Sequence, residues 1–174
     1  MFLQGELCSL RAVEIEDVEL MYRWENNPEV WHVSGTTAPF SHYSIEAFIE
    51  AQRMDIMQSR QLRLIIESAE GEAVGAIDLF EIDPLHRRAG VGILIHDTRR
   101  RRHGYATEAL KLLEEYSLKV LNLHQLWCNV ESRNRASRAL FRGAGYIRVG
   151  SKRAWNWSPE GWQDEVLYQK IISE

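Results

Sequence analysis

Four consecutive arginines stand directly before the turn HGYA (residues 103–106) and an apolar, helix-like pattern. A strand that runs into a helix exposes the first backbone N–H groups of that helix, and the helix dipole adds partial positive charge there. Gly104 lets the backbone approach a ligand, and the small Ala106 keeps the first turn open. Arg101 and Arg102 supply charge for phosphate oxygens. The stretch therefore predicts a diphosphate site, with a solvated basic turn as the alternative.

Other motifs that would carry chemistry are incomplete or absent. The stretch GVGILI (residues 90–95) has two glycines of the dinucleotide-binding fingerprint, but Ile95 stands in place of the third. The sequence contains no G-x-x-x-x-G-K-[ST], H-E-x-x-H or G-x-S-x-G. Cys8 and Cys128 have no metal-type spacing, and the histidines are scattered. We therefore expect two unpaired thiols and no metal.

The length and charge of the chain exclude several classes of protein. With 174 residues, 45% of them hydrophobic, we expect a single domain over residues 1–174. The net charge of -4 argues against a protein that binds nucleic acid or an anionic membrane. The N-terminal segment lacks the basic start and apolar run of a secretion signal, and no window reaches the length of a membrane span. We therefore expect a cytoplasmic protein.

The periodicity of apolar residues predicts an alternation of strands and helices. We expect helices in 16–27, from Ser44 to 56, from Gly104 to the turn at Asn122, and in 132–146, with a loop from Val30 to Tyr43 that could cover a site. The order β, α, α, β, β, β, α, β, α, β, β indicates an α/β or α+β fold around a mixed sheet. The expected strands are 6–13, 61–68, 73–83, 89–97, 124–131, 146–157 and 162–172.

Two segments resemble motifs of one enzyme family. RRHGYA (residues 101–106) is similar to the Q/R-x-x-G-x-G/A turn of the Gcn5-related N-acetyltransferases (GNAT), and residues 134–146 resemble their N-x-x-(A/S)-x-x-L-Y-x-x-x-G-F segment. The wider stretch 75–146 resembles bacterial spermidine N-acetyltransferases and ribosomal-protein-alanine acetyltransferases. The resemblance implies a GNAT fold, with about seven strands, about four helices and a splay between two central strands.

The resemblance also implies acetyl-CoA as co-substrate, lying across the splay. The strand at residues 93–95 would offer backbone groups to the pantetheine, as an added strand pairs with a sheet edge. The turn at residues 101–107 would hold the pyrophosphate, and Asn134 would contact the cofactor arm. The residues so assigned to the cofactor are Ile93, Leu94, Ile95, Arg101, Arg102, His103, Gly104, Tyr105, Ala106, Thr107 and Asn134.

Acyl transfer from a thioester to an amine needs a donor to the oxyanion and a proton for the leaving thiolate. A backbone N–H near Leu94 or Ile95 is the expected oxyanion donor. Many family members use as acid a tyrosine at the position of Phe141, which has no proton to give. Because a thiol has a pKa of about 8.5, water or the departing ammonium could protonate the thiolate. Other candidates for this acid, or simply packed aromatic residues, are Tyr105, Tyr146 and Tyr168.

The sequence also leaves more than one candidate for the general base. Several relatives carry a glutamate at the position of Gly90, which this chain lacks. A carboxylate on an otherwise apolar strand is costly unless it faces a cleft or a partner, which makes Asp78 and Glu81 candidates. The two-residue period puts them on opposite faces unless a bulge intervenes. We favour Glu81 as base, with a water chain as the alternative.

The acceptor implied by the resemblance is a primary amine that attacks the thioester directly: a polyamine, a protein N-terminus or another small amine. Spermidine enzymes carry glutamates in the loop after the first helix, whereas residues 30–44 contain no carboxylate, which argues against a strict polyamine site. A non-catalytic acyl-CoA sensor is the alternative function, and homo-oligomers are plausible in this family. The carboxylates that could attract a cationic acceptor are Glu25, Glu29, Asp164 and Glu165. The tryptophans that either line an acceptor pocket or pack in the core are Trp31, Trp155, Trp157 and Trp162.

Overall fold

The computed structural model describes residues 3–173, apart from the side chains at positions 32 and 33. One mixed seven-stranded sheet runs through them in the order β1-β2-β3-β4-β5-β7-β6. Adjacent strands are antiparallel except for β4 and β5, which are parallel. The strands are β1 (Cys8–Ala12), β2 (Leu62–Ser68), β3 (Ala73–Asp83), β4 (Arg88–Ile95), β5 (Gln125–Glu131), β6 (Ile147–Ser158) and β7 (Gly161–Ile171).

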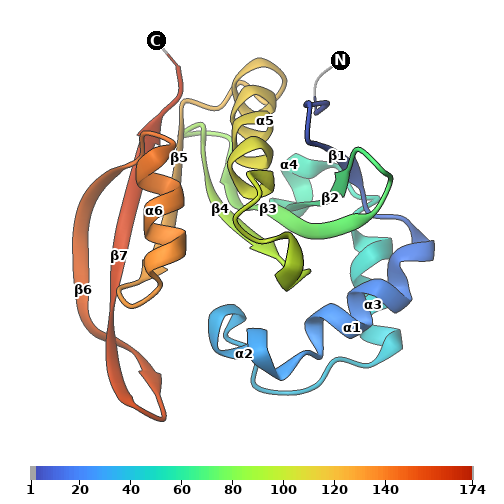
Figure 1. The fold of residues 1–174 in the computed structure, drawn as a ribbon. Helices are drawn as coiled ribbons and strands as arrows, with labels where there is room; N and C mark the ends of the chain where they lie inside the picture. Colours follow the sequence, from blue (N-terminus) through green and yellow to red (C-terminus); the bar gives the residue numbers. More distant parts are fainter. Residues whose placement is uncertain (1–2, 174) are drawn as a thin grey trace.

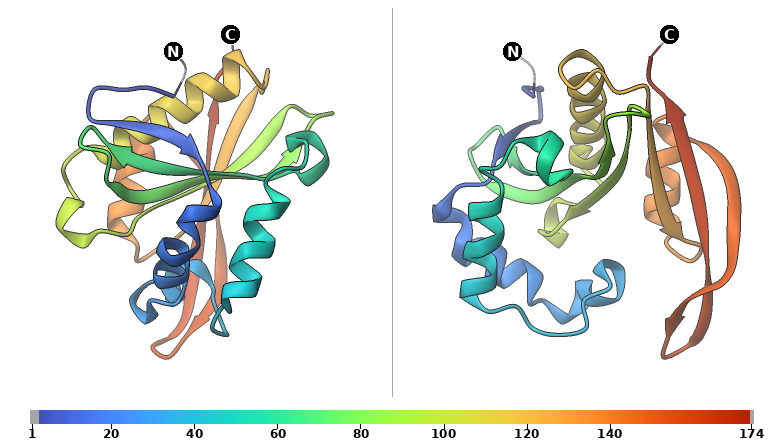
Figure 2. Two further views of the ribbon diagram at one scale, coloured as in Figure 1. Left: turned by 90° about the vertical axis from the view of Figure 1, so that its right-hand side faces the viewer. Right: turned by 180° about the vertical axis from the view of Figure 1, so that it is seen from behind.

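Helices lie on both faces of this sheet. In Figure 1, α5 and α6 lie against one face, and Figure 2 shows α1 and α3 below the strands β1 to β3. Four helices have eight residues or more, which confirms the expected α/β architecture, and two shorter ones are added. The helices are α1 (Val18–Glu25), α2 (Pro28–Ser34), α3 (His42–Ala51), α4 (Ile56–Ser59), α5 (Tyr105–Lys119) and α6 (Arg135–Gly143), with single 3-10 turns at Ile15–Asp17 and Thr98–Arg100.

The segment expected to be a loop, Val30 to Tyr43, is a loop only over residues 35–41, because α2 occupies its beginning and α3 its end. The Asn27 side chain accepts the N–H of Glu29 at 3.0 Å, and Pro28 occupies the first turn of α2. An asparagine followed by a proline can end one helix, but the same pair can also begin the next, with asparagine as the N-cap and proline in the first turn. Gly35, with φ of +70°, ends α2.

Helix α3 begins three residues earlier than expected. Ser41, not Ser44, is its N-cap: the Ser41 hydroxyl accepts the N–H of Ser44 at 3.1 Å, and the Ser44 hydroxyl accepts the N–H of Ser41 at 2.9 Å. Ser44 therefore occupies the third helical position, where its hydroxyl closes a reciprocal cap.

The main core lies between the sheet and α5. Ile77 and Leu79 of β3 are fully buried in one cluster with Leu110 and Leu113 of α5, so these two positions of β3 face that helix. A second cluster, which includes Met21, Ile45 and Ile65, joins α1 and α3 to the opposite face. Cys8 and Cys128 are free and buried, and burial raises the pKa of each thiol to about 12. Both thiols are therefore inert core groups.

The central strands β4 and β5 pair at only one end. Arg88, Ala89 and Gly90 pair with Gln125, Leu126 and Trp127. Beyond Gly90, β4 continues along β3 to Ile95, and β5 continues along β7 to Glu131. The two strands therefore diverge after three residue pairs, which confirms the predicted splay.

Candidate active site

The register of β3 and β4 decides which backbone groups of β4 face the splay. The N–H of His96 donates to the carbonyl of Val74 at 3.0 Å, and Leu94 pairs with Ala76. Along an antiparallel ladder, the residues that bond to the neighbouring strand alternate. Gly92 and Leu94 therefore direct their backbone groups to β3, while those of Ile93 and Ile95 point to the side from which β5 has departed.

This alternation corrects part of the sequence-based prediction. Ile93 and Ile95 offer N–H groups to a ligand in the splay, as expected, but Leu94 does not, because β3 uses its N–H and carbonyl. The Nε of Arg101 donates to the carbonyl of Ile95 at 3.0 Å, so that acceptor is also taken. The N–H groups of Ile93 and Ile95 are thus the backbone donors available to an extended amide chain or an oxyanion.

The N-terminus of α5 is built as an anion site. Its cap is Gly104, which has φ of +92° and provides no capping side chain. The first intrahelical bond there runs from the N–H of Glu108 to the carbonyl of Gly104. The N–H groups of Tyr105, Ala106 and Thr107 therefore have no acceptor within the helix and are free to bind phosphate oxygens.

The one carboxylate in the first turn of α5 is turned away from this site. Glu108 accepts the N–H groups of Glu6, Leu7 and Cys8 at 2.7 to 3.1 Å and so ties α5 to the segment before β1. Burial raises the pKa of Glu108, but the three N–H groups lower it more, so the net shift is downward. The anion site thus keeps its positive potential because Glu108 is directed to the backbone on the other side.

The four arginines divide into two pairs. Arg99 forms an ion pair with Asp97 at 3.1 Å, and Arg100 pairs with Glu70 and Glu72. Within residues 3–173, no carboxylate pairs with Arg101 or Arg102, and the loop that carries them is exposed. This distribution leaves Arg101 and Arg102 without a carboxylate partner in the described part of the chain, and their role at the phosphates stays a prediction.

Asn134 occupies the N-cap of α6. Its Oδ1 accepts the N–H of Ser137 at 3.0 Å, so the oxygen has a structural role. The Nδ2 group remains as the donor for a ligand, and the contact to a cofactor arm stays a prediction.

An acceptor must approach the splay from the face opposite α5 and α6. Val91 and Ile95 are buried on the α5 side. The other face of β4 carries Gly90, Gly92 and Leu94, two of which have no side chain. Gly92, where an added Cβ atom would meet no other atom closer than 3.8 Å, therefore leaves room for a substrate on this open face of the splay.

The position of the missing general base is already filled. A Cβ atom at Gly90 would lie 2.4 Å from Cε2 of Phe80, the residue directly across the ladder. The Phe80 ring also meets Trp127 edge to face, with ring centroids 5.2 Å apart. An aromatic side chain thus covers the glycine where relatives are expected to carry glutamate.

A bulge does intervene between Asp78 and Glu81. The register shifts between Phe80 and Asp83, and Glu81 has φ of +48°. Glu81 is exposed at the rim of a hollow of about 1110 Å³ beside the paired ends of β4 and β5. It lies four residues along β3 from Ile77, the partner of Ile93, which is roughly 13 Å at the usual strand rise. Its role as base stays a prediction, which the rate of Glu81→Gln would test.

Two of the three candidate tyrosine hydroxyls accept hydrogen bonds from arginines. Tyr105 accepts from Arg100 at 3.2 Å, and Tyr168 accepts from Arg138 at 3.1 Å. Tyr146 is buried against Phe141, with ring centroids 5.0 Å apart, and burial followed by the nearby carboxylate Glu114 raises its pKa. None of these contacts prepares a hydroxyl to donate a proton readily at neutral pH, so their acid role stays a prediction.

Sequence reasoning named Asp78 and Glu25 as candidates but missed Arg63, which joins them in a charged network on the open face. Arg63 of β2 donates from Nε and NH2 to Asp78 at 2.7 and 2.9 Å, and from NH1 to Glu25 at 2.5 Å. The signal was present, since Arg63 is a lone charge in the apolar run LRLII. Of the other predicted cation-attracting groups, Glu165 pairs with Lys152, and Asp164 accepts the N–H of Ala154.

Next to this network, the ring of His96 stacks on Trp24. The rings are 4.3 Å apart and nearly parallel, at 1°. Burial, then the positive charges of Arg63 and Arg101, lower the pKa of His96 to about 4. His96 is therefore neutral at pH 7, and the wall that it forms with Trp24 adds no positive charge to the open face.

The lowered pKa of His96 predicts acid sensitivity. Because the unfolded chain has the higher pKa, near 6.5, it binds the proton first, so stability is lost as pH falls from about 6.5 to 4. At about 1.4 kcal/mol per pKa unit, full protonation lowers the free energy of unfolding by about 3 kcal/mol. We expect His96→Phe to show a smaller loss of stability than the parent between pH 7 and 4 in urea titrations. Parallel curves for the two proteins would contradict this assignment.

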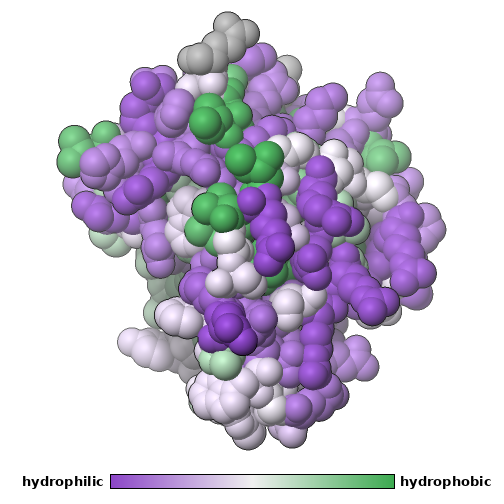
Figure 3. All heavy atoms as spheres, turned by 90° about the vertical axis from the view of Figure 1, so that its left-hand side faces the viewer, coloured by the Kyte–Doolittle hydropathy of each residue, from purple (hydrophilic) through white to green (hydrophobic). Residues whose placement is uncertain are grey.

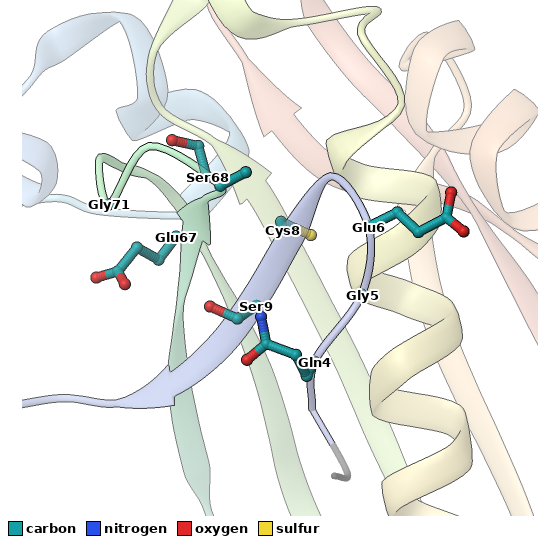
Figure 4. A pocket seen from close by; sticks show the side chains of 9 residues that line it. Gln4, Gly5, Glu6, Cys8, Ser9, Glu67, Ser68 and Gly71 are labelled. Atoms are coloured by element: carbon teal, nitrogen blue, oxygen red, sulfur yellow. The ribbon is translucent and has the colours of Figure 1, made fainter.

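A second, smaller pocket lies far from the splay, between the segment before β1 and the β2–β3 turn. It has a volume of about 220 Å³. Figure 4 shows its acidic side chains Glu6 and Glu67 directed to opposite sides. Its polar groups do not converge on one point, so it is not a candidate catalytic site.

Within the described residues, no group of three or more metal-ligating side chains is found, and no helix has the length and hydropathy to cross a membrane.

Residues 8–147 match the model of a protein family described as an acetyltransferase (GNAT) domain. The chain belongs to the GNAT acetyltransferases. This acetyltransferase is 31% identical over 144 residues to a spermidine N(1)-acetyltransferase of Escherichia coli K12, which covers 81% of this chain and 73% of the relative. The corresponding enzyme of Vibrio cholerae is 26% identical, over 82% of this chain and 80% of the relative.

Solved structures show the same fold. That of a spermidine N-acetyltransferase from Vibrio cholerae in complex with CoA and spermine has a TM-score of 0.87 and 22% identity over 97% of both chains. A dodecameric structure of that enzyme in an intermediate state has a TM-score of 0.81 and 23% identity over 97% of this chain and 96% of the other. The GNAT acetyltransferase described here uses acetyl-CoA as co-substrate for amine N-acetylation, as the two motifs predicted.

Proposed function

We propose that the acetyltransferase binds acetyl-CoA through the splay and the N-terminus of α5, and acetylates a small primary amine that enters over the open face. The observation that carries the proposal is the departure of β5 from β4 after Gly90, which exposes the N–H groups of Ile93 and Ile95. The three N–H groups at residues 105–107, with Arg101 and Arg102, suit a pyrophosphate. Acetyl-CoA supplies the activated acyl group as a thioester.

The protein's own contribution is to position and polarise the reactants. A backbone N–H of Ile93 or Ile95 would stabilise the developing oxyanion, which needs no special side chain. The bound ammonium first loses one proton to water, and the neutral amine nitrogen then bonds to the acetyl carbon as the bond to sulfur breaks. The amine's proton leaves to water, with Glu81 as the predicted alternative, and the thiolate takes a proton from water. The filled space at Gly90 and the apolar Phe141 support solvent as the proton carrier.

The net charge of the side chains on the open face supports an acceptor that binds there through one of its ammonium groups. Glu25, Asp78 and Arg63 together carry one net negative charge. Residues 30–44 add no carboxylate, so a second ammonium gains little there. The relatives named spermidine acetyltransferases make spermidine the first acceptor to assay, bound through one of its amines.

A panel of acceptors tests this function. We expect release of free CoA from acetyl-CoA with at least one primary amine among spermidine, a monoamine of similar length and a peptide with a free N-terminus. Because only one ammonium is held, kcat/KM for spermidine should exceed that of the monoamine by less than tenfold. No turnover with any primary amine would refute the proposal, and a spermidine preference above a hundredfold would refute its single-ammonium form.

Self-association stays a prediction for this chain. Strand β6 ends the sheet, so one of its edges has no neighbouring strand within the described residues. Figure 3 shows the side of the molecule that β6 covers, where apolar spheres form a short row among polar ones. The exposed apolar side chains of β6 are Ile147, Val149, Trp155 and Trp157. An edge strand with such side chains is a plausible contact between copies.

A further inference from the structure

Asp78 lies beside the part of β4 where the acyl group would be held. It pairs with Gly92, and a Cβ atom on that glycine would lie 4.0 Å from the Asp78 Oδ2. The next residue, Ile93, carries one of the two N–H groups that face the splay. With Gly92 in place, no side chain from β4 stands between the carboxylate and the open face.

We propose that Asp78, supported by Arg63 and Glu25, binds the ammonium group of the acceptor amine. This inference rests on the proposed function and names the subsite for its substrate. Asp78 accepts two hydrogen bonds from Arg63, and each carboxylate oxygen has a further lone pair for an ammonium proton.

The charges of the network favour a cation. One guanidinium lies between two carboxylates, so the three side chains keep one negative charge when ionised. Their side chains are 17 to 21% exposed, which means that a ligand can reach them while bulk water screens them only partly. A neutral His96 and the aromatic rings of Trp24 and Phe48 surround the network without adding charge of their own.

The same arrangement occurs once more, away from the splay. Arg11 donates to Asp17 at 2.8 and 2.9 Å and to Glu67 at 2.6 Å. It belongs to β1, at the far edge of the sheet from β5. Asp17 therefore offers a matched control: the same residue type, paired with an arginine that also holds a glutamate, but far from the splay between β4 and β5.

The test compares Asp78→Asn with Asp17→Asn in steady-state assays with the best acceptor of the panel. For Asp78→Asn we expect KM for the amine to rise at least tenfold, with kcat within about threefold and KM for acetyl-CoA unchanged. Asp17→Asn removes a structural carboxylate, so it should lower the melting temperature and leave KM for the amine unchanged. Glu25→Gln makes the same one-charge change without touching β3, and should raise KM for the amine at least threefold.

The outcomes separate this inference from the proposed function. An Asp78→Asn protein whose KM for the amine is unchanged, or which loses kcat at constant KM, overturns the ammonium subsite. If Asp78→Asn does not fold, an unchanged KM in Glu25→Gln overturns it instead. Failure of the parent enzyme to acetylate any amine would refute the proposed function before the variants are compared.

Discussion

Thr107→Asp is expected to weaken acetyl-CoA binding at least tenfold while leaving the protein as stable as the parent or slightly more stable. Thr107 is exposed at the third position of α5, beside Gly104 and the unpaired N–H groups of the first turn. An aspartate there interacts favourably with the helix dipole, by about 0.3 to 1 kcal/mol. The same charge repels the pyrophosphate and competes for its donors, and tenfold in affinity corresponds to about 1.4 kcal/mol.

The prediction is specific because Thr107→Asp should weaken acetyl-CoA binding without lowering the stability of the free protein. Calorimetric titration with acetyl-CoA and thermal unfolding of the free protein measure the two quantities separately. Thr107→Asn is the control, because asparagine has nearly the shape of aspartate without its charge. This variant should bind acetyl-CoA with an affinity within about threefold of the parent's. If Thr107→Asp folds and binds acetyl-CoA with unchanged affinity, the pyrophosphate does not lie at the N-terminus of α5.

Gly90→Glu, the change that restores the glutamate expected in relatives, is predicted to destabilise the protein by about 3 kcal/mol or more. The new Cβ would meet the Phe80 ring at 2.4 Å, and Gly90 is buried beneath it. Forcing atoms into a filled site costs about 1 to 3 kcal/mol, and burying a carboxylate without a partner adds to this cost. Urea unfolding of the variant measures the loss.

A double-mutant cycle shows whether Phe80 is the cause. With Phe80→Ala the ring is removed, so Gly90→Glu should cost at least about 1 kcal/mol less than in the parent background. Phe80→Ala alone is the control, since it loses the contact with Trp127. Equal costs of Gly90→Glu in both backgrounds would show that the obstacle lies elsewhere.

These two predictions concern different parts of one reaction. In the proposed function, the N-terminus of α5 governs the affinity for acetyl-CoA, whereas the face that carries Phe80, Asp78 and His96 governs the acceptor and its proton. The chain has the two motifs of the family but lacks the glutamate and the tyrosine expected at Gly90 and Phe141. A catalyst of this kind relies on backbone donors and on positioning of the amine, since the thiolate leaves readily.

Local signals were sufficient for most of the fold and for recognising acetyl-CoA as the co-substrate. The apolar alternation of β3 and β4, the periodicity of α5 and the turn at Gly104 are properties of short segments, and their physical causes act within a few residues. Arg101 and Arg102 were separated from their neighbours on the same basis. The errors at α2 and α3 were also local, because Asn27 and Ser41 can each be assigned to the element before or after them.

The acceptor side was decided only by tertiary structure. Whether Leu94 or Ile93 faces the splay depends on the register with β3, which a one-residue slip would reverse. Phe80 reaches Gly90, and Arg63 joins Asp78 to Glu25, across strands and a helix that lie far apart in the sequence. The sequence by itself determined the fold and acetyl-CoA as the acyl donor, because local patterning and short motifs carry them. Long-range packing decided which charged side chains lie beside β4, because only folding brings those side chains together.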